Sequence, residues 1–282
     1  MVVAASVGFN IGGSSTGVAF GPAVGSGTVS KLAAAALMSV FVLLGGWTVG
    51  RNVVETMGGE IVPSGQFTLA ASVTVLLFLG LALLVPNLFG VPASTSMIAV
   101  AGLGLATGTL DWGAMGRVVS RLAGRAGPRV PDLCGRRPVP LSLPRRLVRA
   151  RPLGGWGRLP RPLRPRARRR EVAGTVLVVA IACYMAFSAG ASNVANAVAP
   201  LVGSGAVSTD AGVLLAAGAI GVRAFTIARR TLDTVGNDLT DLPLLAALIV
   251  ETVAATLISA LSAIGIPASL AVSATVCIVG LG

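Results

Sequence analysis

A duplicated segment constrains this chain more than any other feature. The stretch FNIGGSSTGVAFGPAVGSGTVS, from Phe9 to Ser30, returns as FSAGASNVANAVAPLVGSGAVS from Phe187 to Ser208, with 11 of 22 positions identical and no gap. At a nearly equal spacing, Gly90-Val-Pro-Ala-Ser94 returns as Gly265-Ile-Pro-Ala-Ser269. In so apolar a chain, two halves built around one Gly-, Ser- and Asn-rich motif are typical of a secondary transporter, whose substrate binds where the repeats meet.

The composition places the chain in a membrane. Its 282 residues are 54% hydrophobic and 11% charged, with a mean hydropathy of +0.85, and such a surface is not stable in water. Spanning helices need about 17 to 25 mostly apolar residues. The candidates lie near residues 1–11, 32–50, 66–86, 93–110, 172–189, 209–225, 243–264 and 268–282. We therefore expect a multi-pass, all-α integral membrane protein of the cell membrane.

The same pattern divides the chain into three parts. We expect residues 1–112 and 172–282 to be two homologous helical repeats, inverted relative to each other, with broken helices at their interface. Residues 113–171 connect them. Only eight residues precede the first motif, and the chain stops at Gly282 inside an apolar run. We therefore expect the first repeat to be truncated at its N-terminus and the second at its C-terminus.

The connector differs in composition from both repeats. Residues 117–170 hold 17 of the 22 lysines and arginines and one acid, Asp132, so their net charge is +16. Nine of the 16 prolines also lie there, and we expect this segment to be disordered. Three interpretations remain open: a basic loop facing cytoplasmic anionic lipid, an out-of-frame stretch of a GC-rich gene, and a nucleic-acid binder. Nucleic acid is disfavoured, because Trp156 is the segment's only aromatic stacking partner.

Missing and isolated residue types exclude several kinds of site. The chain contains no histidine, which excludes imidazole catalysis and histidine-bound metals. Cys134, Cys183 and Cys277 are isolated and suggest neither a disulfide framework nor a metal site. Because no nucleophile and base pair or phosphate-binding loop motif is visible, we expect that the protein is not an enzyme and has no cofactor.

Both copies of the motif place polar groups in apolar surroundings. The first offers Ser14, Ser15 and Thr16, and the second offers Ser192, Asn193 and Asn196. If each motif breaks a helix within the membrane, the freed N–H groups and the positive end of the helix dipole favour an anion. The side chains add further hydrogen-bond donors. The alternative is that these small residues only pack helices together, but two copies at matched positions favour a substrate site.

Two Pro-Ala-Ser elements each open an apolar segment. Pro92 and Pro267 suit the first turn of a helix, and they are followed by Ser94 and Thr95 and by Ser269. These hydroxyls either cap the helix or bind the anion, because both roles use the exposed N–H groups of a helix start.

A coupling cation has three candidate ligands: Asn10, Asn196 and Glu251. Asparagine coordinates a cation through its amide oxygen. Glu251 lies in the middle of an apolar span, where an ionisable group is costly and marks a functional residue by default.

With both motif pairs in view, the chain resembles the inorganic phosphate transporter (PiT) family. Each half of that family carries a Gly-Ala-Asn-Asp-Val-Ala-Asn signature and a later Pro-Val-Ser-Thr-Thr-His element. Here GASNVANAVAP in the second half is close to the signature, GGSSTGVAFGP in the first half is more divergent, and PAST and PASL keep part of the later element. The resemblance covers residues 1–112 and 172–282.

The resemblance implies a dimeric, all-helical carrier of inverted repeats that moves phosphate together with sodium or protons by alternating access. By position, Ser14 and Ser15 stand where the signature has Asn-Asp, Ser192 and Asn193 stand there in the second half, and Asn196 matches the final Asn. Both signature aspartates and the later histidine are therefore replaced.

These replacements affect the coupling ion and the substrate in opposite directions. Loss of two carboxylates removes hard oxygen ligands for sodium, whereas it eases the binding of a doubly charged oxyanion. Hydroxyl and backbone donors suit sulfate as well as phosphate. We therefore expect a phosphate transporter. The alternatives are a sulfate permease of the same family and a non-transporting membrane remnant of a disrupted gene. Membrane lipid and a second copy of the chain are the other expected partners.

Overall fold

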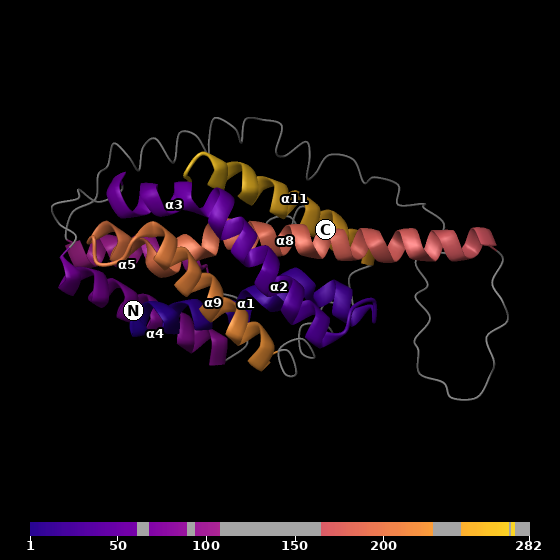
Figure 1. Cartoon of the computed structure of the whole chain (residues 1–282), viewed down its shortest axis with the longest axis horizontal. Helices are drawn as coiled ribbons and strands as arrows, with labels where there is room; N and C mark the ends of the chain where they lie inside the picture. The colour runs from indigo at the N-terminus through magenta and orange to yellow at the C-terminus, as the bar shows by residue number, and fades with distance from the viewer. Residues whose placement is uncertain (61–67, 89–93, 108–164, 228–243, 271, 274–282) are drawn as a thin grey trace.

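The computed structural model describes residues 1–60, 68–88, 94–107, 165–227, 244–270 and 272–273 (Figure 1). This part of the chain is built from helices and turns and contains no strand, which confirms the all-α prediction. In chain order, the elements are α1 (Val2–Gly25), α2 (Lys31–Gly45), η1 (Gly46–Gly50), α3 (Arg51–Glu55), η2 (Thr56–Glu60), α4 (Leu69–Leu88), α5 (Thr95–Thr107), α8 (Pro165–Gly203), α9 (Thr209–Ile227) and α11 (Leu244–Ala263).

Four helices among the described residues are long and apolar enough to cross a membrane. They are Lys31–Gly59, which joins α2, η1, α3 and η2, together with Val172–Gly203, Thr209–Thr226 and Leu245–Ala263. Leu69–Val85 and Thr95–Gly104 are shorter apolar helices. The span expected at residues 1–11 is the first half of the longer helix α1, and the span expected at 268–282 lies mostly outside the described residues.

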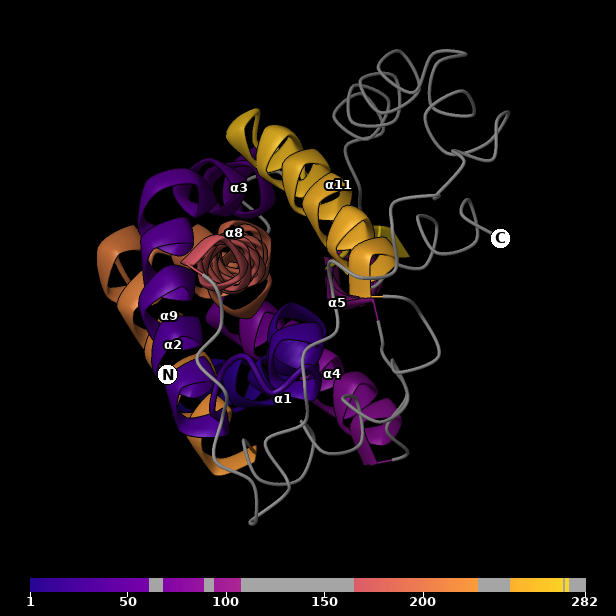
Figure 2. The same cartoon turned by 90° about the vertical axis from the view of Figure 1, so that its right-hand side faces the viewer.

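Helix α8 forms the centre of the bundle. A view along its axis shows α1, α2, α3 and α11 arranged around it (Figure 2). All residues from 188 to 201, which include the second motif, are buried, whereas residues 172–177 are exposed. The helix begins at Pro165, inside the range predicted for the connector, and the remainder of 113–171 lies outside the described residues. The second motif is therefore covered on every side by other parts of the chain.

Two matched turns follow the motif helices, and local chemistry explains both. Gly27 has a φ of 72° and Gly205 a φ of 70°, which is the left-handed region that favours glycine. In each turn, a backbone N–H returns to the helix, from Thr28 to Ala23 O at 3.0 Å and from Ala206 to Leu201 O at 3.1 Å. Because the two glycines hold the same place in the two copies of the motif, the repeated sequence VGSG builds the same helix end twice.

The motif helices pack reciprocally. In α1, a Cβ placed on Gly12 would collide with the backbone carbonyl of Ile220 in α9, and in α8, a Cβ on Gly190 would collide with the carbonyl of Val42 in α2. Gly12 and Gly190 lie 178 residues apart, which is the spacing of the two motif copies, and so do Val42 and Ile220. Each motif helix therefore packs at close range against a helix from the other half of the chain, which small residues allow in membranes.

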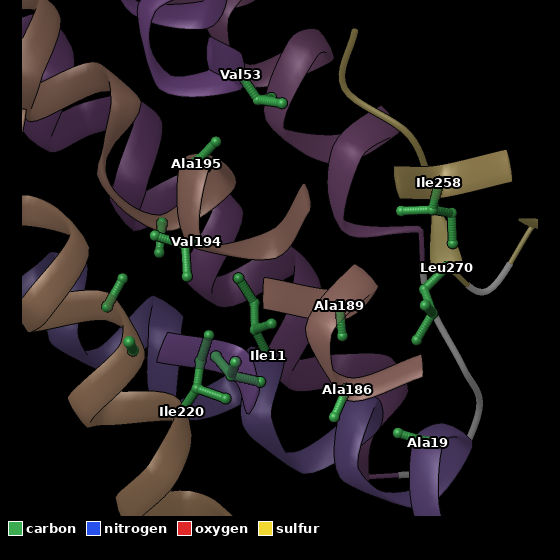
Figure 3. Packing of buried hydrophobic residues seen from close by; sticks show 14 of the residues in the cluster. Ile11, Ala19, Val53, Ala186, Ala189, Val194, Ala195, Ile220, Ile258 and Leu270 are labelled. Atoms are coloured by element: carbon green, nitrogen blue, oxygen red, sulfur yellow. The ribbon is translucent and has the colours of Figure 1, made fainter. Parts of the chain in front are cut away.

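Apolar side chains fill the space beside these crossings. Ile11 of α1, Val194 of α8 and Ile220 of α9 gather in one region (Figure 3), and each is at most 1% exposed. Because lipid is as apolar as these side chains, the stabilisation comes from dispersion contacts at close packing rather than from transfer out of water.

The predicted helix breaks within the motifs are wrong. Helix α1 continues from Val2 to Gly25 and α8 from Pro165 to Gly203, through both Gly-rich segments. Close contacts with neighbouring helices hold the glycines in helical form. A break is described instead at the second Pro-Ala-Ser element, where α11 ends at Ala263 and helix resumes at Leu270; most of the first element lies outside the described residues. Inversion of the two halves stays a prediction.

Candidate functional site

Uncharged polar side chains gather where α1, α5 and α8 meet. We call this group the central cluster, and it consists of Ser15, Thr95, Ser96, Ser192, Asn193 and Asn196. Each of the six residues is at most 5% exposed. Five of them were predicted from sequence, whereas Ser96 was not. The motif residues come from the middle of two continuous helices, and Thr95 and Ser96 come from the first turn of α5.

Asn193 connects the second motif to two elements of the first repeat. Its Nδ2 donates to Ser15 Oγ in α1 at 2.9 Å, and its Oδ1 accepts from Thr95 Oγ1 in α5 at 2.8 Å. Hydrogen bonds between buried side chains fix their relative positions, since the alternative is an unsatisfied polar group away from water. Asn193 is thus the side chain on which the predicted substrate residues from both halves converge.

Asn196 extends the cluster by one turn of α8. Its Nδ2 donates to Thr95 Oγ1 and to Ser96 Oγ, both at 3.1 Å. Its Oδ1 is buried and has no hydrogen-bond partner within the described residues. A buried, unpaired acceptor costs free energy, so this oxygen suits a ligand that carries a donor or a positive charge.

The carbonyl oxygen of Ala268 completes the cluster from the second half of the chain. It accepts from Ser96 Oγ at 2.8 Å and also from Ser192 Oγ. Ala268 belongs to the extended segment after α11, and Gly265, with a φ of 75°, makes the turn that leads into this segment. The Pro-Ala-Ser element of the second half therefore contacts the helix start of the first half.

Ser94 and Ser269 act as helix caps. Ser94 Oγ accepts from the Met97 N–H at 3.4 Å, and Ser269 Oγ accepts from the Val272 N–H at 3.3 Å. Both side chains are partly buried. Of the two roles left open by sequence, the structure therefore supports capping for these two serines, whereas Thr95 lies in the cluster.

Ser14 and Thr16 direct their hydroxyls to their own helix. Ser14 Oγ donates to Ile11 O at 3.1 Å, and Thr16 Oγ1 donates to Gly12 O at 2.7 Å. Thr16 is fully buried and Ser14 is partly buried. Both flank Ser15, so a rotation about χ1 is the step that would bring either hydroxyl to a ligand.

The three candidate cation ligands differ in burial. Asn10 is partly buried in α1, where its Nδ2 donates to Ser6 O at 3.1 Å. It lies about 7.5 Å before Ser15 along the helix axis, at a rise of about 1.5 Å per residue. Asn196 is in the cluster. Pro200 cannot donate an N–H to the carbonyl oxygen of Asn196, so Asn196 offers a backbone oxygen in addition to Oδ1.

Glu251 is a buried carboxylic acid in α11. It is 5% exposed, and its Oε1 has no hydrogen-bond partner in the part of the chain that the structure describes. Ala255 O and Ser259 Oγ, one and two turns later, bond with Ser188 of α8 at 2.9 and 2.7 Å. The periodicity of the helix therefore places Glu251 on the face of α11 that meets α8.

The central cluster combines hydrogen-bond donors with an absence of charge. Its six side chains are hydroxyls and amides, and the described residues contain no group of three or more His, Cys, Asp or Glu that could hold a metal ion. Hydroxyls and amides bind an anion by donating hydrogen bonds, which are stronger when the acceptor is charged. An oxyanion at this position would meet donors from both halves of the chain and no carboxylate within the cluster.

Two features of the site were not predicted from the sequence. The Ala268 carbonyl carries no sequence signal, because any residue supplies a backbone oxygen. Ser96 does carry one: it follows Ser94 and Thr95 directly, so the Ser-Thr-Ser run itself was the available signal.

Comparisons with known proteins agree with this architecture. The chain is 30% identical over 277 residues to the sulfate permease CysP of Bacillus subtilis (strain 168), in a match that covers 97% of this chain and 73% of the relative. The fold matches a solved structure described as the sodium-dependent phosphate transporter with a TM-score of 0.75 and 18% identity, over 100% of this chain and 88% of that one. The sequence profile of the phosphate transporter family matches residues 11–123 and 160–282. The chain therefore belongs to the phosphate transporter family of membrane transport proteins.

Proposed function

We propose that this chain is a multi-pass permease of the cell membrane that carries a tetrahedral oxyanion, with phosphate as the leading candidate. One observation carries the proposal: Asn193 joins Ser15 of the first motif and Thr95 of α5 at hydrogen-bonding distance, deep inside the bundle. Uncharged donors from both halves thus converge on one buried point, as expected for a carrier built from two repeats.

Binding of the oxyanion requires an exchange of hydrogen bonds. In the arrangement described above, Ser15, Thr95 and Asn193 satisfy one another. An oxyanion that enters between α1, α5 and α8 accepts from these same groups, and bonds to a charged acceptor replace neutral ones. Since the exchanged bonds link the two halves, occupancy of the site is coupled to their relative position, which is what alternating access needs.

The unpaired oxygen of Asn196 favours phosphate. Monohydrogen phosphate carries an O–H group, which can donate to Asn196 Oδ1, the buried acceptor that lacks a partner among the described residues. Sulfate carries no proton at neutral pH and leaves this oxygen unsatisfied. An unsatisfied buried acceptor costs about 1 to 3 kcal/mol, which is sufficient to discriminate between the two anions.

Sulfate is the second candidate, and two observations support it. The relative with 30% identity is named a sulfate permease, and the central cluster needs no carboxylate acceptor to hold a fully deprotonated anion. Both candidates use the same donors, so they differ in the role of Asn196 rather than in the location of the site.

We further propose that transport is coupled to sodium or protons. Glu251 is the strongest candidate for the residue that binds the coupling ion, because it is a buried glutamate on the α8-facing side of α11. Asn196 offers uncharged oxygens, and Asn10 is the most exposed candidate. The exposed apolar side chains of α4 and α8 would contact lipid or a second copy of the chain. We propose a transport role for the protein and no enzymatic one.

Uptake into vesicles tests the proposal. The purified chain is reconstituted into phosphatidylcholine vesicles, and uptake of radiolabelled phosphate and sulfate is measured with a sodium gradient, with a proton gradient and with neither. We expect phosphate uptake that is faster than in protein-free vesicles. Asn196→Leu should lower phosphate uptake more than sulfate uptake, while Ser204→Ala, which removes a hydroxyl that donates to Leu201 O at the end of α8, should match the unmodified chain.

Each alternative predicts a different result. Faster uptake of sulfate than of phosphate, with equal losses of both in Asn196→Leu, would favour the sulfate permease. Uptake of neither anion by a folded chain would favour the non-transporting remnant.

A further inference from the structure

Arg223 is a positive charge in the last turn of the candidate span Thr209–Thr226, and its side chain is partly buried. Its guanidinium lies over the ring of Phe9, with Cζ 4.4 Å from the ring centroid, and its Nε is buried without a hydrogen-bond partner. Within the described residues, no carboxylate pairs with it, in contrast to Arg51, which bonds Asp210 at 2.5 Å. An ionisable side chain without a charged partner in an apolar span is costly, and such residues usually serve a ligand or a pathway.

The repeat shows that packing does not require this charge. In the other copy, the position that matches Arg223 is Gly45, and the position that matches Phe9 is Phe187. Gly45 packs directly against the backbone carbonyl of Phe187. The same helix crossing is thus built once with glycine and once with arginine, so the arginine has a role that is absent from the other half.

The arginine side chain also lies against the start of the first motif. Its Cβ lies against Gly12 of α1, and its guanidinium stacks on Phe9, one turn earlier in the same helix. An arginine that only escapes the membrane turns its charged end to water. Stacking on an aromatic ring instead fixes the guanidinium while its N–H donors stay available to an anion.

We infer that Arg223, held by Phe9, forms a docking site for a doubly charged tetrahedral oxyanion before that anion reaches the central cluster. Phe9 precedes Ser15 by about 9 Å along α1. The central cluster binds through neutral donors, so it exerts little attraction over distance. Arg223 supplies the attraction, and its planar fork of donors matches two oxygens of phosphate or sulfate. This inference rests on the proposed function and adds a second, charged position to it.

Transport kinetics of four variants in phosphatidylcholine vesicles test the docking site. Arg223→Gln should raise the half-saturating concentration of the transported anion about tenfold and leave the maximal rate unchanged. The reason is that a positive charge near the site raises the association rate of an anion by about 10-fold or more. Arg223→Lys should recover part of this loss, and Phe9→Leu should show a smaller loss. Lys31→Gln removes a positive charge at the start of α2 and should match the unmodified chain.

A second lipid composition separates the substrate from a lipid phosphate as the bound anion. The loss in Arg223→Gln should be the same with and without phosphatidylglycerol. A loss seen only with phosphatidylglycerol would assign Arg223 to a lipid headgroup and overturn the inference.

An unchanged half-saturating concentration in Arg223→Gln would also overturn the inference, even if the unmodified chain transports well. If Arg223→Gln does not fold, the other variants decide. Equal half-saturating concentrations in Arg223→Lys, Phe9→Leu and the unmodified chain would then overturn the inference. Transport of neither anion by the unmodified chain would overturn both the inference and the proposed function.

Discussion

Asn193 Nδ2 donates to Ser15 Oγ across 2.9 Å, and the two residues occupy the same position in the two copies of the motif. In the signature of the family, both positions are aspartate. Two carboxylates at this distance repel each other unless a cation or a shared proton lies between them. An amide and a hydroxyl attract instead. The two replacements in this chain are therefore complementary, because together they convert a like-charge contact into a neutral hydrogen bond.

Removal of either partner should weaken anion binding, and the two losses should not add. Asn193→Ala and Ser15→Ala each remove a donor to a charged acceptor, which costs about 1.5 to 3 kcal/mol and raises the half-saturating concentration at least tenfold. Because the two side chains bond each other, the double variant should lose less than the sum. Kinetics of vesicle uptake measure all three, with Ser204→Ala as the control. Unchanged kinetics in both single variants would remove them from the site.

Restoration of one aspartate should make uptake depend on sodium. Asn193→Asp places a carboxylate beside Ser15 in a buried position, where an unpaired charge is costly and repels an anion. We expect uptake to fall strongly in sodium-free buffer and to recover as sodium is added. The measurement is the initial uptake rate against sodium concentration. A variant that is insensitive to sodium and as active as the unmodified chain would show that position 193 is remote from both ions.

The close crossing of α8 and α2 should tolerate no added methyl group. Gly190→Ala places a Cβ against the Val42 carbonyl, and overpacking of this kind costs about 1 to 3 kcal/mol. Gly218→Ala is a matched control, because a Cβ there meets nothing within 4 Å, and alanine is favoured over glycine in a helix by about 1 kcal/mol. Thermal unfolding in detergent should show a lower Tm for the first variant and an equal or higher Tm for the second.

Glu251 should matter for accumulation rather than for binding. Glu251→Gln keeps the shape of the side chain and removes its ability to ionise, so a gradient of sodium or protons should no longer drive uptake against the anion gradient. Exchange of labelled for unlabelled anion should continue. Glu55→Gln, at an exposed position in α3, should retain both activities. Gradient-driven accumulation by Glu251→Gln would exclude this residue as the coupling group.

Parts of the fold follow from local sequence. The turns at Gly27 and Gly205 need a left-handed residue, and Ser30 caps α2 by accepting from the Ala33 N–H at 3.3 Å. These requirements involve neighbours in the chain, so the pattern VGSG followed by serine predicts them twice. The pairing of Ser15 with the second motif could also be predicted from the sequence, because matched positions in two copies that meet at an interface lie near each other.

The continuity of the two motif helices could not be predicted from local sequence. Glycine-rich segments favour a break by local propensity, by about 1 kcal/mol for each glycine relative to alanine. What keeps Gly12 and Gly190 helical is contact with Ile220 and Val42, which lie far away in the chain. In the second half, Gly265 and Pro267 interrupt the helix instead, and their effect is local.

A single backbone oxygen, that of Ala268, holds one hydroxyl from α5 and one from α8. If the short segment between α11 and Leu270 swings away, Ser96 and Ser192 lose their acceptor in the same instant and both become free to turn toward a solute. A small hinge in the second half would thereby release two donors together, so that motion of the chain controls when the central cluster binds its anion.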